Sequence, residues 1–258
     1  MLFTGCGIIH RFQCPFFGKG LMSESTSNRF NFTALPGLYR LGGTAALVML
    51  GIMIVQIIVF IIWPPPTTVE GFFALFESSK LLGLLSMDLL YIVNNAILAL
   101  IYLALFAALQ PAGKTAMTIA LVSGLVGICA YFASNTAFEM LSLSGQYAAA
   151  STESQKMLYL AAAEGMLAIY RGTAFLVYYV LNAIALLILA MVMLKSNFFS
   201  KGTAIIGLVA GILMAVPSTA GTVGMVFALA SLVPWGIFLV LIARAFFAAG
   251  RREMIGNE

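Results

Sequence analysis

Apolar runs of about 20 residues, separated by short polar segments, recur along the chain from Leu41 to the C-terminal end. A helix of roughly that length crosses the ~30 Å hydrocarbon core of a membrane. Because lipid offers no hydrogen bonds, the backbone groups of each run must be paired within the run, which predicts helices. The chain lacks the alternating pattern that is typical of outer-membrane barrel strands. The pattern therefore predicts an all-α, polytopic transmembrane helix bundle.

Six crossing helices are expected, with boundaries set by Pro, Gly and charged residues. A triple proline stops the first helix, and a Pro-Ala-Gly-Lys turn separates the second from the third. Gly207 and Gly211 form a GxxxG pair in the fifth, a spacing that permits close helix packing. The six helices are expected at 41–63, 82–109, 116–141, 173–194, 203–219 and 225–247.

Two further helices are expected on one side of the membrane. Residues 67–80 mix Phe and Leu with charged residues, which indicates a short amphipathic helix along the membrane surface. The chain from Thr152 onward could be helical as far as Leu194, but 42 residues would extend roughly 63 Å, about twice the hydrocarbon core. We therefore expect an extra amphipathic outer helix capped by Thr152, then a bend near Gly172.

The first 33 residues follow a different pattern. Residues 1–21 contain the only His and two of the three Cys. Gly18-Lys19-Gly20 would be encoded by a purine-rich run just before Met22, as a bacterial ribosome-binding site is. We therefore hypothesise that Met22 is the native start and that residues 1–21 are not translated natively, which intact-mass measurement would test. The expected organisation is a polar or disordered segment at 1–33, a six-helix transmembrane domain at 34–250 and a cytoplasmic tail at 251–258.

Composition and charge agree with a membrane location. Hydrophobic residues make up 62% of the chain and charged residues 9%, whereas soluble domains are about a quarter charged. Positive residues accumulate on the cytoplasmic side of membranes, so we expect a plasma-membrane protein with both termini in the cytoplasm. Ten Lys and Arg then lie inside (Arg11, Lys19, Arg29, Arg40, Lys114, Lys195, Lys201, Arg244, Arg251 and Arg252), against three outside (Lys80, Lys156 and Arg171).

The residue inventory argues against most enzyme classes. His10 is the only His, so the helices offer no His for haem, zinc or a Ser-His pair. Asp88 is the only Asp, which excludes a two-Asp protease dyad within one chain. Cys129 stands alone and is interpreted as a small hydrophobe. We expect no metal and no cofactor. Because the basic residues form no stripe, no nucleic-acid partner is expected either.

Polar residues nevertheless align on three of the predicted helices, toward the outer half of the bundle. On each, the spacing of 3, 4 or 7 residues places the side chains on one face. The amides lie deep enough that each must find a partner, because an unpaired polar group in lipid costs several kcal/mol. The candidate ligand-binding residues are Asp88, Tyr91, Asn95, Tyr131, Asn135, Glu139, Arg171, Tyr178 and Asn182.

These stripes allow three interpretations. They could line an outward-facing polar pocket that binds or transports a small polar or lipid-like solute. Alternatively, they could be interhelical hydrogen bonds, with Arg171 paired to a carboxylate, in a non-enzymatic accessory or assembly subunit that docks another membrane protein. A membrane enzyme that uses Glu139 or Asp88 as acid or base ranks a distant third. A cavity favours the first interpretation and a filled core the second.

Three short segments resemble a known family. They are residues 131–141 (YFASNTAFEML), 146–148 (QYA) and 170–175 (YRGTAF). Together they are similar to an uncharacterised multi-pass membrane protein family of bacteria and archaea, domain of unknown function 4386. The resemblance covers about residues 39–250 and implies a prokaryotic membrane protein. It implies no activity and no catalytic residues.

Overall fold

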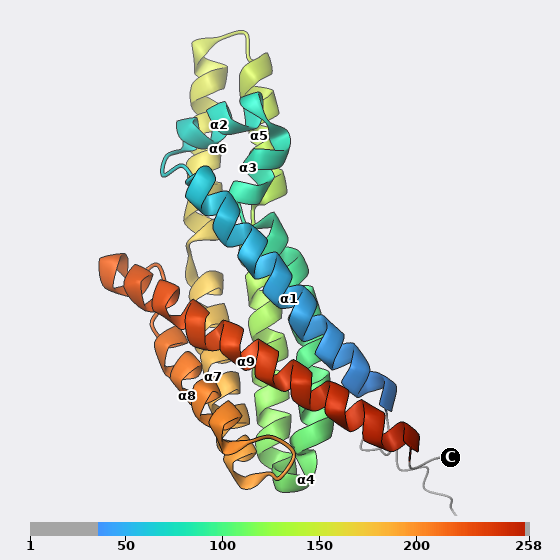
Figure 1. The fold of residues 1–258 in the computed structure, drawn as a ribbon. Coiled ribbons are helices and arrows are strands. Elements are labelled where there is room, and N and C mark those ends of the chain that lie inside the picture. The colour runs from blue at the N-terminus through green and yellow to red at the C-terminus, as the bar shows by residue number, and fades with distance from the viewer. Residues whose placement is uncertain (1–35, 256–258) are drawn as a thin grey trace, which may run out of the picture. The chain divides into compact units, whose positions relative to one another are not determined.

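The computed structural model describes residues 36 to 255, and within that range every regular element is a helix. The expected segment 1–33 and the hypothesis on Met22 lie outside the described residues. Figure 1 shows the arrangement. In chain order the helices are α1 (Pro36–Ile62), α2 (Val69–Ser78), α3 (Lys80–Ser86), α4 (Leu89–Ser134), α5 (Ala137–Ala149), α6 (Glu153–Tyr170), α7 (Thr173–Lys195), α8 (Lys201–Met214) and α9 (Gly221–Ile255).

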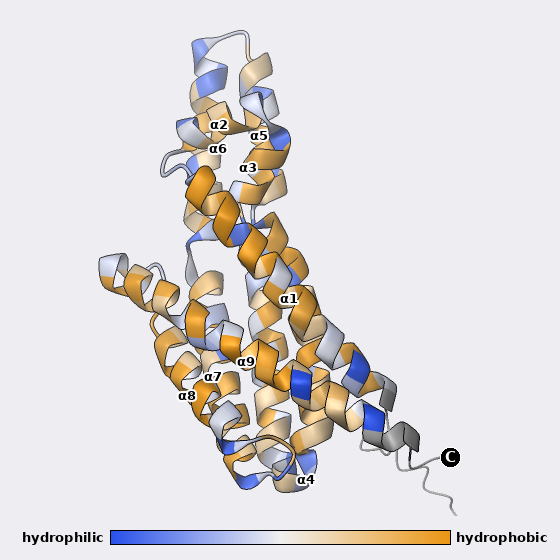
Figure 2. Cartoon of the chain, in the orientation of Figure 1, coloured by the Kyte–Doolittle hydropathy of each residue, from blue (hydrophilic) through white to orange (hydrophobic). Residues whose placement is uncertain are grey.

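Four helical stretches are long and apolar enough to cross a membrane, namely Gly37–Ile62, Leu89–Ala149, Glu153–Lys195 and Gly221–Arg251. Only 33% of the most apolar window of α1, and 28% of that of α9, is buried inside the protein. Most of their apolar side chains therefore face outward, which suits helices whose solvent is lipid. Figure 2 shows the hydrophobic colouring along α1, α7, α8 and α9. These features suit a membrane-embedded helical protein.

The 46 residues of α4 form a hairpin. The backbone leaves the helical conformation at Gly113, two residues after Pro111. A Cβ placed on Gly124 would lie 2.4 Å from the ring of Tyr102, although 22 residues of straight helix would separate the two by about 33 Å. The two halves therefore run back along each other, as the green helices of Figure 1 show. The turn predicted at 110–114 is confirmed.

The predicted ends of these two helices were wrong. The helix expected at 82–109 is interrupted at Asp88, so that α3 ends at Ser86 and α4 begins at Leu89. The helix expected at 116–141 ends at Ser134, and α5 begins after two non-helical residues. Both breaks lie at the same end of the hairpin, because Asn135 Nδ2 donates a hydrogen bond to the carbonyl of Met87. Long-range contacts, which local pattern does not reveal, thus end both helices.

Helices α2, α3, α5 and α6 enclose a small core of their own. The two further helices expected at 67–80 and from Thr152 onward are present as α2 and α6. The side chains and backbones of Thr152 and Gln155 cap α6 reciprocally. However, α2 does not present its aromatic face to lipid, because Phe72 and Phe76 are fully buried. The buried residues of this small core are Val69, Phe72, Phe73, Phe76, Met87, Ala137, Met140, Ala163 and Leu167.

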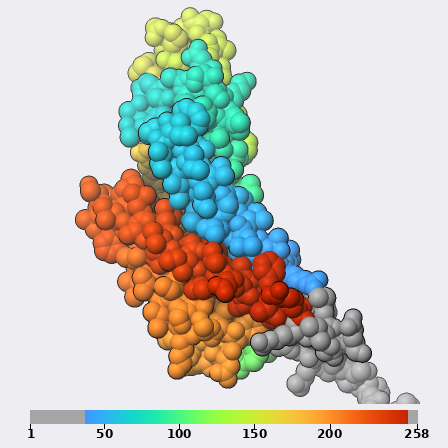
Figure 3. All heavy atoms as spheres, in the orientation of Figure 1, coloured from blue at the N-terminus to red at the C-terminus, as the bar shows by residue number. Residues whose placement is uncertain are grey.

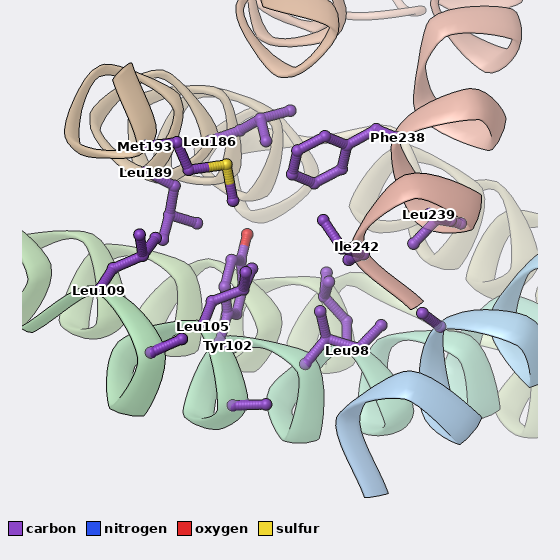
Figure 4. Packing of buried hydrophobic residues seen from close by; sticks show 14 of the residues in the cluster. Leu98, Tyr102, Leu105, Leu109, Leu186, Leu189, Met193, Phe238, Leu239 and Ile242 are labelled. Carbon is purple, nitrogen blue, oxygen red and sulfur yellow. The ribbon is translucent and has the colours of Figure 1, made fainter. Parts of the chain in front are cut away.

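The larger core lies between α1, α4, α7, α8 and α9. Figure 4 shows leucines of α4 and α7 meeting Phe238, Leu239 and Ile242 of α9. The GxxxG prediction is supported, because a Cβ on Gly207 would lie 2.9 Å from Phe238, and one on Gly211 would lie 2.9 Å from Leu187. Small residues thus let α8 approach both neighbours. The predicted bend near Gly172 is also confirmed, between α6 and α7.

Candidate binding cavity

A cavity of about 980 Å³ lies among α1, α4, α7 and α9, near the junction of α6 and α7. Its volume is at the upper end of the range of small-molecule sites, roughly 300–1,000 Å³. In the space-filling view a hollow separates the first turns of α9 from α1 and α2 (Figure 3). The core of the bundle is therefore open at this level, whereas further along α4 the buried side chains of Leu105 and Leu109 pack into it (Figure 4).

Seven of the nine candidate residues line this cavity. They come from both halves of the α4 hairpin, from the end of α6 and from α7. The most distant pair, Asp88 and Asn182, is separated by 94 positions in sequence. That they bind a ligand stays a prediction. The seven are Asp88, Tyr91, Asn95, Tyr131, Arg171, Tyr178 and Asn182.

The other two candidates lie elsewhere because α4 ends at Ser134. The i, i+4, i+8 stripe that joined Tyr131 to Glu139 requires an unbroken helix. Glu139 is instead exposed, in the first turn of α5. Asn135 is fully engaged as a structural residue, because its Nδ2 donates to the Met87 carbonyl at 3.0 Å and its Oδ1 accepts from the backbone N–H of Ala137 at 3.1 Å.

Asp88 has unusual local geometry. It is the only described non-glycine residue with positive φ, at 62°, in the left-handed region that Asp tolerates better than most residues. It occupies the N-cap position of α4, yet its side chain caps no backbone N–H. The carboxylate instead accepts a short hydrogen bond from the hydroxyl of Tyr170 on α6. The Asp88 carboxylate therefore does not cap α4 and instead lines the cavity.

The surroundings of Asp88 alter its acidity. This half-buried side chain precedes the apolar stretch that begins at Leu89. Burial raises the pKa of its carboxyl from 3.8 to about 6, and the hydrogen bond from Tyr170 opposes the rise. The carboxyl therefore changes charge within about a unit of neutral pH.

A buried hydrogen bond closes the inner side of the polar region. The hydroxyl of Tyr102 donates to Asn182 Oδ1 at 2.6 Å, joining α4 to α7. Figure 4 shows the hydroxyl of Tyr102 pointing away from α4 toward α7. Asn182 Nδ2 donates to the carbonyl of Tyr178. Asn182 is thus fully partnered, as expected for an amide at this depth.

Other polar atoms in the wall have no partner. The unpaired, buried atoms are Gln56 Oε1, Asn94 Oδ1, Asn95 Oδ1 and the hydroxyl oxygen of Tyr131. Each of these residues lines the cavity and is at most 3% exposed. An unsatisfied buried polar atom costs about 1–3 kcal/mol. Four together are unusual in a purely structural core and common where a ligand or ordered water completes the bonding.

Several lining residues were not among the candidates. Asn94 adjoins Asn95 but lies about 100° away around the helix, so it fell outside the stripe. Tyr170 belongs to the segment expected to form the outer helix and to none of the polar stripes. Gln56 belongs to no stripe, but it is the only amide in the first apolar run. A lone amide in an apolar helix is the sequence feature that could have marked it as a candidate. Trp235 looks like an ordinary core aromatic in sequence, and nothing local marks it.

The cavity wall carries two opposite charges that are not paired with each other. Among the described residues that line it, Asp88 and Arg171 are the only charged ones. Between described side chains the one ion pair within 4 Å is Lys156 with Glu153, on the exposed face of α6. The pairing of Arg171 with a carboxylate, expected if the stripes were purely structural, is therefore not formed. No group of three potential metal ligands occurs among the described residues.

Comparison with family models, with curated proteins and with solved structures gave no match. The case for function therefore depends on the geometry of the cavity.

Proposed function

We propose that this chain is a multi-pass protein of a prokaryotic plasma membrane, with six crossings and both termini in the cytoplasm. The hairpin of α4 supplies two crossings and the 14 residues of α8 a short one, in addition to α1, α7 and α9. The ten-to-three distribution of Lys and Arg supports this orientation. Membership of the domain of unknown function 4386 family is part of the same proposal. The cavity then opens toward the outer side.

In this arrangement the protein binds a small amphipathic solute, as a receptor or as a step in its transport. The observation that carries the proposal is the 980 Å³ cavity with unpaired polar atoms in its wall. Its polar end, around Asp88 and Arg171, lies at the junction of α6 and α7, while Met49, Met53 and Trp235 provide apolar surface from α1 and α9. A solute with a polar group and an apolar portion satisfies both regions, because unpaired polar atoms need partners and apolar walls exclude water.

Filling the cavity tests this function. Ala228 lines the cavity, whereas Ala230 is exposed two positions along the same helix. Ala228→Trp should remove the small molecules retained on gentle extraction, as detected by native mass spectrometry, because the indole occupies their space. Ala230→Trp should leave them bound.

Equal retention by both variants would contradict the proposal, as would wild-type protein that carries no small molecule under any extraction condition. A protein that instead retains only another membrane protein would favour the accessory-subunit interpretation. Thermal unfolding of both variants controls for misfolding, because a folded Ala228→Trp protein is required for the comparison.

A further inference from the structure

The polar end of the cavity contains aromatic rings set around the Asp88 carboxylate. Tyr131 and Tyr178 have ring centroids 4.9 Å apart, and Phe175 lies 5.1 Å from Tyr179. Tyr178 and Tyr179 meet at 87°, with an edge of one ring against the face of the other. All four residues line the cavity. These rings form one aromatic wall beside the carboxylate, and a cation that enters the cavity meets their remaining faces.

The carboxylate lies among these rings. Tyr170 of α6 donates a hydrogen bond to it, and the hydroxyls of Tyr91 and Tyr131 of α4 and of Tyr179 of α7 lie within electrostatic range of it. No described Lys or Arg lies within 4 Å of it. A half-buried carboxylate held without a cation has incomplete charge compensation. The strained φ of Asp88 maintains this arrangement, and strain of this kind is concentrated at functional sites.

Aromatic faces and a carboxylate together favour one ligand chemistry. Aromatic rings attract cations through the negative potential of their faces, and quaternary ammonium groups are bound in this way by aromatic cages. An anion would meet the carboxylate and the same negative faces, so it is disfavoured at this position. Arg171 lies at the same end of the cavity, where it can receive an anionic group attached to the cation.

We propose that the polar end of the cavity binds an organic ammonium group, held by Asp88 and the tyrosine faces, on an amphipathic molecule whose apolar portion contacts Met49, Met53 and Trp235. This inference rests on the proposed function and names its ligand class. Zwitterions in which a phosphate adjoins the ammonium bind best, because Arg171 pairs with the phosphate. Methionine is well suited to the apolar portion because its flexible thioether adapts to irregular chains.

Trp235 provides a reporter inside the cavity. The chain has two Trp, and Trp63→Phe removes the other. Protein in phosphatidylglycerol nanodiscs would be titrated with dodecyl probes that carry a nitroxide on the tail and either trimethylammonium, phosphocholine, sulfate or glucoside as the head. The measured quantity is the saturable quenching of Trp235 emission. We expect the trimethylammonium probe to bind about tenfold more tightly than the glucoside probe and the phosphocholine probe more tightly still, whereas the sulfate probe should bind more weakly than the glucoside probe.

Variants separate the roles of the charges. Asp88→Asn tolerates the left-handed backbone and should abolish the preference for ammonium over glucoside. Glu139→Gln removes an exposed carboxylate outside the cavity and should leave that preference unchanged, which controls for the effect of net charge on partitioning. Arg171→Gln should weaken binding of the phosphocholine probe but not of the trimethylammonium probe.

The outcomes distinguish the two levels of the proposal. Saturable quenching that is equal for all four heads, and unchanged in Asp88→Asn, would overturn the ammonium assignment while leaving cavity binding intact. Absence of saturable quenching by any probe would overturn the proposed function itself. Repeating the titration in phosphatidylcholine nanodiscs identifies the source, because weaker probe binding there would indicate that lipid headgroups occupy the same site.

Discussion

At the scale of single residues, Asp88 combines several features that seldom occur together. It is the only Asp of the chain and has a left-handed backbone. It also occupies a helix N-cap without capping it, and Tyr170 donates a hydrogen bond to it from 82 positions away. Asn135 holds the preceding carbonyl, that of Met87. Contacts from two distant parts of the chain thus fix the position of one carboxylate, which is more support than a solvated surface charge requires.

The charge of Asp88 makes ligand binding pH-dependent. With a pKa of about 6, the carboxyl is mostly ionised at pH 7.5 and mostly protonated at pH 5.0. The affinity for the trimethylammonium probe should therefore fall about tenfold between those values, because only the ionised form attracts the cation. Tyrosines ordinarily titrate near ~10, so Tyr91, Tyr131 and Tyr179, which face the carboxylate, stay neutral over this range.

Titration of probe binding in wild-type and Asp88→Asn proteins measures this dependence. The variant should give a flat profile, and a wild-type affinity that stays constant from pH 7.5 to 5.0 would contradict the prediction.

At the scale of elements, the α4 hairpin determines which side chains meet in the cavity. It supplies Asp88, Tyr91 and Asn95 from its first half and Tyr131 from its second. Close contact between the halves depends on Gly124, whose missing side chain leaves room for the Tyr102 ring. The same ring carries the hydroxyl that binds Asn182. Packing of the hairpin and attachment of α7 therefore share one residue.

A single methyl group on Gly124 should loosen this region. Gly124→Ala would place its Cβ 2.4 Å from Tyr102, and overpacking of this kind costs about 1–3 kcal/mol. Gly145→Ala is the matched control in α5, because nothing lies within 4 Å of its added Cβ and alanine favours helix by up to about 1 kcal/mol. Thermal unfolding in detergent should show a lower midpoint for the first variant and an unchanged or higher one for the second. The same midpoint in both would indicate that the hairpin does not need this close approach.

At the scale of the whole molecule, the arrangement has two cores of different character. The larger one lies among long helices whose outward faces are apolar. The smaller lies among α2, α3, α5 and α6, which carry most of the exposed polar residues between α1 and α7. Our proposed topology places the first core in the membrane and the second outside the cell.

Labelling of single cysteines tests that topology. In a background with Cys6, Cys14 and Cys129 replaced by Ala, Ser151→Cys introduces an exposed thiol between α5 and α6, and Asn197→Cys introduces one between α7 and α8. A membrane-impermeant maleimide added to intact cells should label only the first, because the second faces the cytoplasm in the proposed topology. Both should react after permeabilisation. Labelling of the second thiol in intact cells would contradict the proposed orientation and indicate the opposite one.

The fold could be predicted from sequence wherever local chemistry decides it. The Thr152 cap, the turn near Gly113 and the bend at Gly172 follow from residues within a few positions, and each was confirmed. The breaks at Asp88 and Asn135 could not be foreseen, because each depends on hydrogen bonds to residues 82 and 48 positions away. The prediction of candidate residues was wrong at the same helix break. Glu139 was assigned to a continuous helix, and the break at Asn135 places it outside the cavity.

The outer group of α2, α3, α5 and α6 has a practical consequence for experiments on this protein. Membrane proteins of 27.5 kDa that are enclosed by detergent offer few features for aligning single-particle images. The helices α5 and α6 extend beyond the apolar part of the bundle and are fixed by a capping box and a small aromatic core. A binder raised against their tip would therefore provide a rigid fiducial for imaging the protein with and without its ligand.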